Sequence, residues 1–221
     1  MPARVVMPAA LAVLFTLVDS SVGMASTQAA TSPATARVVV RPVTEAGTPA
    51  PGVLVTSDQQ AGTVDCRTRE PSPGAVSRDI EFCTPSAAYA IACWKSATPR
   101  QVLCSRDPRS GRVWSLPRTG AFAPTGLAGK RKRAPLMLVL GNGKTCSIRD
   151  GGAWSSLKEH PKWYGTYSCD GNAAVWSPSG APDSGVNESR STWTVHVGSI
   201  SGNGPVTVRT VRKAYFVGTA Q

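Results

Sequence analysis

Residues 164–177 read YGTYSCDGNAAVWS, and this stretch decides the class of fold. The segments Tyr164 to Cys169 and Ala173 to Ser177 contain aromatic and β-branched residues, which favour strands. Between them, residues 170–172 (Asp-Gly-Asn) are residue types that favour tight turns. The stretch therefore predicts a β-hairpin.

Two more stretches repeat this pattern of strand, turn and strand. Gln101 to Arg106 and Arg112 to Leu116 flank the turn sequence Asp-Pro-Arg-Ser-Gly. Leu136 to Leu140 and Lys144 to Arg149 flank Gly-Asn-Gly, in which Asn-Gly is a strong hairpin signal. Both stretches predict hairpins.

Other segments also favour strands. Trp193 to Val197 alternates between apolar and polar residues, and Pro205 to Gly218 predicts a long strand with a bulge near Thr210. Residues 86–95 (SAAYAIACWK) are ambiguous, because their alanines suit a helix equally well. Together the patterns predict a mainly β fold, built of antiparallel hairpins in one β-rich domain or two small subdomains.

The cysteine content predicts stabilisation by disulfides. The six cysteines are Cys66, Cys83, Cys93, Cys104, Cys146 and Cys169. An even number in an exported chain is typical of a disulfide framework, and six cysteines allow about 15 pairings. Sequential pairing is the simplest, since it keeps each bridge inside one segment. The spacing lacks the Cys-x-x-Cys of a zinc site and the chain has two histidines, so we expect no metal site.

The N-terminus predicts export. An apolar stretch from Val5 to Val18 follows Arg4, and Gly23-Met24-Ala25 provides a small-x-small cleavage pattern. We expect cleavage after Ala25, with an uncleaved anchor as the alternative. No later stretch is long and apolar enough to predict a transmembrane span, so none is expected after cleavage.

The whole chain is then expected to have five parts. These are a signal peptide (1–25), a flexible or loosely docked lead-in rich in Ala, Thr, Pro and Ser (26–60), a first Cys-containing β-rich segment (61–120), a basic linker or loop (121–135) and a second Cys-containing β-rich segment (136–221).

The charge indicates which partners to expect. The formal net charge is +11, and removal of residues 1–25 leaves it unchanged because they contain one charge of each sign. Outside the cytoplasm, a basic protein is suited to anionic cell-envelope polymers or to an acidic extracellular protein.

Two motif searches exclude functions. Residues 141–146 (GNGKTC) resemble part of a phosphate-binding loop, but the position of its first glycine is Leu138, so we expect no nucleotide and no cofactor. The only candidate bases for a hydrolytic triad are His160 and His196, and neither has the sequence context of a known triad beside Ser184. The sequence therefore assigns no catalytic residue.

Residues 154–167 (WSSLKEHPKWYGTY) combine aromatic rings with lysines. Such a loop can stack on sugar rings or contact anionic polymers. The candidate ligand-contact residues are Trp154, Lys158, Lys162, Trp163, Tyr164 and Tyr167. The alternative is that these rings fill the core of a small disulfide-bonded sheet.

The expected export signal, CSIRDGGAW (146–154), YSCDGNAAVW (167–176) and the ending AYFVGTA (214–220) resemble small exported disulfide-bonded proteins of high-GC Gram-positive (actinobacterial) bacteria. The similarity covers mainly residues 136–221. These proteins have no assigned function, so the resemblance implies no activity and no functional residues.

The leading hypothesis is a non-enzymatic, exported, disulfide-stabilised protein that binds or has a structural role at the cell envelope. One alternative is a secreted hydrolase with a site assembled from scattered residues. Another is a protease-inhibitor-like protein that uses the loop 107–112 between two predicted strands.

Overall fold

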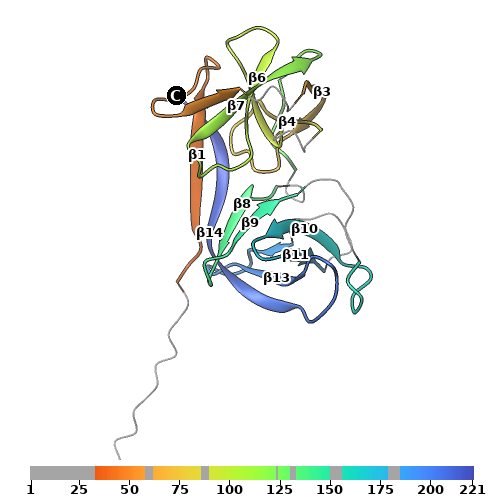
Figure 1. Ribbon diagram of the computed structural model, residues 1–221. Helices are drawn as coiled ribbons and strands as arrows, with labels where there is room; N and C mark the ends of the chain where they lie inside the picture. The colour runs from red at the N-terminus through yellow and green to blue at the C-terminus, as the bar shows by residue number, and fades with distance from the viewer. Residues whose placement is uncertain are drawn as a thin grey trace, which may run out of the picture. The chain divides into compact units, whose positions relative to one another are not determined.

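The computed structural model describes residues 33–57, 62–85, 90–122, 124–129, 133–149, 156–178 and 185–221 (Figure 1). All the regular elements of these residues are strands, which confirms the predicted mainly β fold. The strands are β1 (Ala36–Thr44), β2 (Leu54–Ser57), β3 (Val64–Pro71), β4 (Ile80–Thr84), β5 (Ala92–Lys95), β6 (Gln101–Ser105), β7 (Arg112–Thr119), β8 (Met137–Leu140), β9 (Thr145–Ile148), β10 (Tyr164–Cys169), β11 (Ala173–Ser177), β12 (Val186–Asn187), β13 (Thr194–Ser199) and β14 (Thr207–Ala220).

The strands form two sheets, each of which closes on itself. Sheet A has the order β1-β14-β8-β9-β10-β11-β13-β12, and an additional pairing of β13 with β14 closes it. Sheet B has the order β2-β7-β3-β4-β5-β6, and an additional pairing of β6 with β7 closes it. The strands β1, β2 and β12 lie outside the closed parts, each paired with one neighbour.

The three predicted hairpins are present as β6–β7, β8–β9 and β10–β11, each antiparallel. In the β8–β9 turn, Gly143 has φ +84°, a conformation that glycine adopts without strain. The ambiguous segment 86–95 contains β5 at Ala92–Lys95. The register of β14 shifts between Val211 and Lys213, close to the bulge expected near Thr210.

The disulfides follow the sequential pairing, Cys66–Cys83, Cys93–Cys104 and Cys146–Cys169. Cys93 and Cys104 are directly opposite each other on β5 and β6, and Cys146 and Cys169 on β9 and β10. The register of these strands therefore brings the sulfur atoms together. Two bridges join strands of sheet B, and one joins strands of sheet A.

The expectation of a flexible or loosely docked lead-in over 26–60 does not hold for residues 36–57. β1 pairs in parallel with β14, and β2 pairs in parallel with β7. Val43 of β1 is fully buried. The sequence could not indicate this, because each pairing joins segments that are far apart along the chain.

The pair β1–β14 contributes to the cores of both sheets. Phe216 lies in the core of sheet A, whereas Val43 and Val217 pack with Ile80 and Trp94 from sheet B. A parallel bridge between Ala75 and Val217 connects β14 to the segment before β4. Figure 1 shows β1 and β14 side by side along their length. Their C-terminal ends are thus fixed beside sheet B.

Among the described residues, no helix has the length and apolar character needed to cross a bilayer.

Candidate ligand-binding cavity

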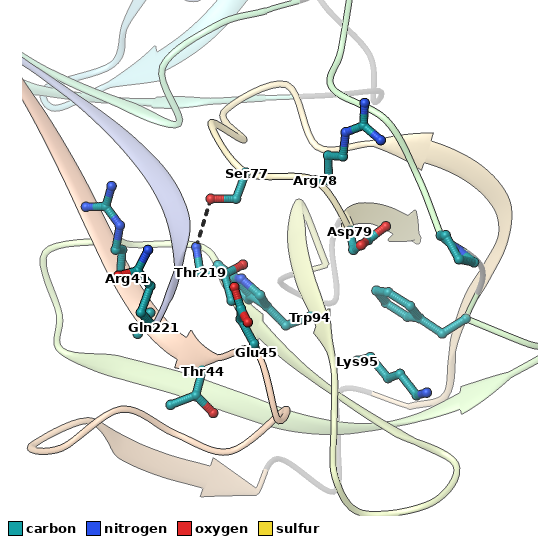
Figure 2. Close-up of a pocket in the computed structure, with 13 residues that line it drawn as sticks. Arg41, Thr44, Glu45, Ser77, Arg78, Asp79, Trp94, Lys95, Thr219 and Gln221 are labelled. Atoms are coloured by element: carbon teal, nitrogen blue, oxygen red, sulfur yellow. Dashed lines mark hydrogen bonds between the residues drawn. The ribbon is translucent and has the colours of Figure 1, made fainter.

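A cavity of about 890 Å³ lies at the C-terminal ends of β1 and β14 (Figure 2). Its lining comes from β1 and the turn after it, from the segment before β4, from β5, from the segment after β7 and from the end of β14. The lining residues are Arg41, Thr44, Glu45, Ser77, Arg78, Asp79, Trp94, Lys95, Phe122, Pro124, Thr219, Ala220 and Gln221.

Trp94 forms the most enclosed part of this lining. The residue is 2% exposed, and its ring packs in the apolar cluster that contains Ile80, Val43 and Leu103. Its indole Nε1 has no hydrogen-bond partner among the described residues. An unsatisfied buried donor costs about 1–3 kcal/mol.

Three cations line the same cavity as Trp94, namely Arg41, Arg78 and Lys95, and they come from different segments (Figure 2). All three residues are exposed. The ion pairs found within the described parts of the chain join Asp65 to Arg67 and Asp107 to Arg109, and none involves a cavity residue. The three charges are therefore available to an anionic ligand.

Two carboxylates, Glu45 and Asp79, also line the cavity. Asp79 is held by two hydrogen bonds: its Oδ1 accepts from the Thr125 amide at 2.8 Å, and its own amide donates to the Thr125 carbonyl at 3.1 Å. Its φ of +60° is unusual for a residue other than glycine. These bonds fix Asp79 where the chain enters β4.

The turn after β1 places Glu45 at the cavity. Its amide donates to the Ala220 carbonyl at 3.1 Å, and the Ala97 amide donates to the Gly47 carbonyl at 2.9 Å. Gly47 has φ +76°, and a Cβ there would lie 2.5 Å from the Lys95 carbonyl oxygen. Only glycine permits this close approach of the turn to β5.

The segment before β4 forms the opposite wall, which is attached to β14. Ser77 Oγ accepts a hydrogen bond from the Thr219 amide at 3.1 Å, and the Val76 amide donates to the Val217 carbonyl at 2.8 Å. A Cβ at Gly218 would lie 3.2 Å from Ser77 Oγ and 3.4 Å from Arg41 Cγ. These contacts pack the wall closely against β14 and fix its position.

The residues that line this cavity were not identified from the sequence. Arg41 and Glu45 lie in the segment interpreted as a lead-in, and Trp94 and Lys95 in the ambiguous stretch 86–95. They come from separate parts of the chain, and no local motif marks them.

The described residues of the predicted aromatic loop lie in different environments. Trp154 lies outside the described residues. Lys158 and Lys162 are exposed, and Tyr164 is 53% exposed. Trp163 packs against the cluster formed by Leu157, Ala174 and Trp176, so this part of the loop covers sheet A.

Tyr167 is not a ligand-contact residue, because it is fully buried in the core of sheet A. Its hydroxyl donates a hydrogen bond to the Pro135 carbonyl at 2.8 Å. Burial raises the pKa of the Tyr167 phenol well above its ordinary value. The alternative interpretation, that the rings fill the core, is correct for this residue.

Both histidines of the chain contact Trp163. The His160 ring stacks on it with 4.3 Å between centroids, and the His196 ring meets it edge-on at 5.0 Å. Neither histidine lines the cavity. Ser184 lies outside the described residues, so the triad considered from the sequence is not tested.

The loop 107–112 contacts sheet A through Arg109. Pro108 is buried, and the Arg109 guanidinium donates to Asp107 Oδ1 at 3.3 Å and to Thr145 Oγ1 at 3.1 Å. The Asp107 carboxylate raises the pKa of Arg109. Arg109, Ser110, Gly111 and Arg112 are nevertheless exposed.

One group of potential metal ligands occurs among the described residues, formed by Cys66, Glu81 and Cys83. The two cysteines form a disulfide, so neither offers a thiolate. The group does not have the donors of a metal site.

The comparisons with known proteins gave no match, whether with family models, with curated proteins or with solved structures. The case for a function therefore depends on the cavity.

Proposed function

We propose that this protein acts outside the cell as a binding protein, and that the cavity holds an anionic group of a cell-envelope molecule. The observation that carries the proposal is that one cavity is lined by Arg41, Arg78 and Lys95, none of which forms an ion pair within the described chain.

Two further properties support a location outside the cell. Three disulfides stabilise the chain, and such bonds persist in oxidising compartments. The formal net charge of +11 attracts anionic polymers and accelerates their encounter with the protein. The charge alone gives weak, unselective binding, whereas the cavity brings three cations into one lining.

The proposal is tested by co-sedimentation of the purified protein with an insoluble bacterial cell-wall preparation. The double variant Arg41→Ala/Arg78→Ala should weaken binding at least about tenfold, since a hydrogen bond to a charged group contributes about 1.5–3 kcal/mol. The matched control, Arg209→Ala/Arg212→Ala, removes the same charge from exposed positions of β14 outside the cavity and should bind nearly as well as the original protein.

Equal losses in the two double variants would show that binding depends on net charge and not on the cavity. That result, or an original protein that does not sediment with the cell wall, would overturn the proposal.

A further inference from the structure

We infer that the ligand is zwitterionic: a short peptide or peptide end that carries a free carboxylate and a free ammonium group. This inference rests on the proposed function, since it specifies the ligand of the same cavity. It starts from the presence of both signs of charge in one lining. Arg41, Arg78 and Lys95 are positively charged, and Glu45 and Asp79 are negatively charged.

These opposite charges do not neutralise each other. No nitrogen of the three cations lies within 4.0 Å of a carboxylate oxygen in the described chain, since the ion pairs found there are Asp65–Arg67 and Asp107–Arg109. Figure 2 shows that the charged side chains of the lining belong to different segments of the chain. Charged groups that line one cavity without pairing leave room for a ligand that contacts both signs.

The carboxylates also disfavour a purely anionic ligand. A polyphosphate or a polycarboxylate would approach Glu45 and Asp79 as well as the cations, and juxtaposed like charges oppose binding. Asp79 cannot easily turn away, because its Oδ1 is bound to the Thr125 amide at 2.8 Å. An ammonium group on the ligand converts this repulsion into attraction.

The uncharged lining suits a peptide. Phe122, which is partly buried, and Pro124, which is exposed, provide an apolar surface for a side chain. A cavity of about 890 Å³ is large enough for a molecule of this size.

The test uses calorimetric titration of the full exported protein with three probes. Glycyl-leucine carries both charges, N-acetylglycyl-leucine carries the carboxylate alone, and glycyl-leucinamide carries the ammonium alone. Glycyl-leucine should bind about tenfold more tightly than either capped form, because each cap removes one charge-assisted contact.

The variant Glu45→Gln should abolish the advantage of glycyl-leucine over N-acetylglycyl-leucine without weakening the binding of the latter. Glu159→Gln, an exposed control outside the cavity, should change neither affinity. The inference is overturned if the two probes bind equally well to the original protein, or if Glu45→Gln weakens both to the same extent.

Failure of the inference is distinguishable from failure of the proposed function. If N-acetylglycyl-leucine binds as tightly as glycyl-leucine and Arg41→Ala/Arg78→Ala weakens both, the cavity binds anions without selecting the ammonium group. If that double variant binds both probes like the original protein, both proposals are wrong. If no probe binds, the peptide inference is overturned, and the cell-wall experiment decides the proposed function.

Discussion

Sheet A and sheet B are both closed, but different interactions fill their interiors. The core of sheet A contains large side chains, among them Tyr167, Trp193 and Phe216, and a single disulfide. One cluster in sheet B consists mainly of small residues and the four cysteines of two disulfides, with Leu116 as its largest buried aliphatic side chain. Sheet B also packs Ile80, Trp94 and Leu103 in a second apolar cluster, so its two bridges lie in one of its two buried clusters.

The arginines of the two sheets show the same contrast. Arg37 on β1 lies over the rings of Trp193 and Phe216, with its Cζ 5.5 Å and 4.7 Å from their centroids. Arg67 on β3 instead pairs with Asp65 at 2.6 Å, and its hydrogen bonds lower the pKa of Asp65 to about 2. In sheet A even an exposed cation extends the aromatic packing.

The largest expected effect comes from removing the disulfides of sheet B. The bridges close sequence separations of 17 and 11 residues, and each contributes about 3 kcal/mol by the chain-entropy estimate. Replacing Cys66, Cys83, Cys93 and Cys104 by alanine should therefore cost about 6 kcal/mol, comparable with the total stability of many domains. Hydrogen exchange should show sheet B opening before sheet A.

The matched variant Cys146→Ala/Cys169→Ala should cost about half as much and leave sheet A closed at room temperature. Equal protection of both sheets in the four-cysteine variant would contradict the view that sheet B depends on its bridges.

The next largest effect tests the aromatic core of sheet A. Phe216→Ala should lower the free energy of unfolding by about 3–5 kcal/mol, because it removes a ring that is 2% exposed and leaves a cavity. Val208→Ala, at a residue that is 60% exposed on the same strand, should change it by less than about 0.5 kcal/mol. Urea denaturation measures both, and a loss below about 1 kcal/mol for Phe216→Ala would mean that its packing is unimportant.

A smaller effect concerns the hydroxyl of Tyr167. Tyr167→Phe removes its hydrogen bond to Pro135 and should cost about 1 kcal/mol at neutral pH. Because the folded-state pKa of this phenol is raised, the protein should lose stability as pH rises above the unfolded-state value of about 10. Tyr167→Phe should lose less stability than the wild-type protein between neutral pH and pH values above about 10, as measured by urea denaturation at each pH. An equal loss in both proteins would show that ionisation of Tyr167 does not cause it.

The smallest effect tests the stacking of Arg37. Arg37→Gln should destabilise the protein by about 0.5–1 kcal/mol, the contribution of an exposed cation–π contact. Arg212→Gln removes an equal charge from β14 and should have no measurable effect. The midpoint of thermal unfolding compares the two variants. Equal decreases in Tm would show that the loss of a positive charge, and not the loss of ring stacking, causes the destabilisation.

Local patterns predicted the local structure of this protein well. The hairpin around residues 170–172 and the Asn-Gly turn before Lys144 follow from turn chemistry within a few residues. The sequential disulfide pairing was the simplest of many, and the opposed register of the strands explains it.

The arrangement of distant segments was not predictable. The parallel pairing of β1 with β14 joins residues near 40 to residues near 217, and no local signal specifies it. The cavity depends on that pairing, since Arg41 and Thr44 reach it from one strand and Thr219 from the other. For Tyr167, the sequence showed an aromatic residue but not which side of the sheet would bury it.

The central claim is that the cavity at the ends of β1 and β14 is the ligand site, and NMR titration of the isotope-labelled protein with glycyl-leucine tests it most directly. The indole N–H signal of Trp94, assigned by its absence in Trp94→Phe, should shift in a saturable way together with the amide of Thr219. Signals around Trp163, on the outer face of sheet A, should not move. Saturable shifts around Trp163 with an unchanged Trp94 signal would contradict the claim.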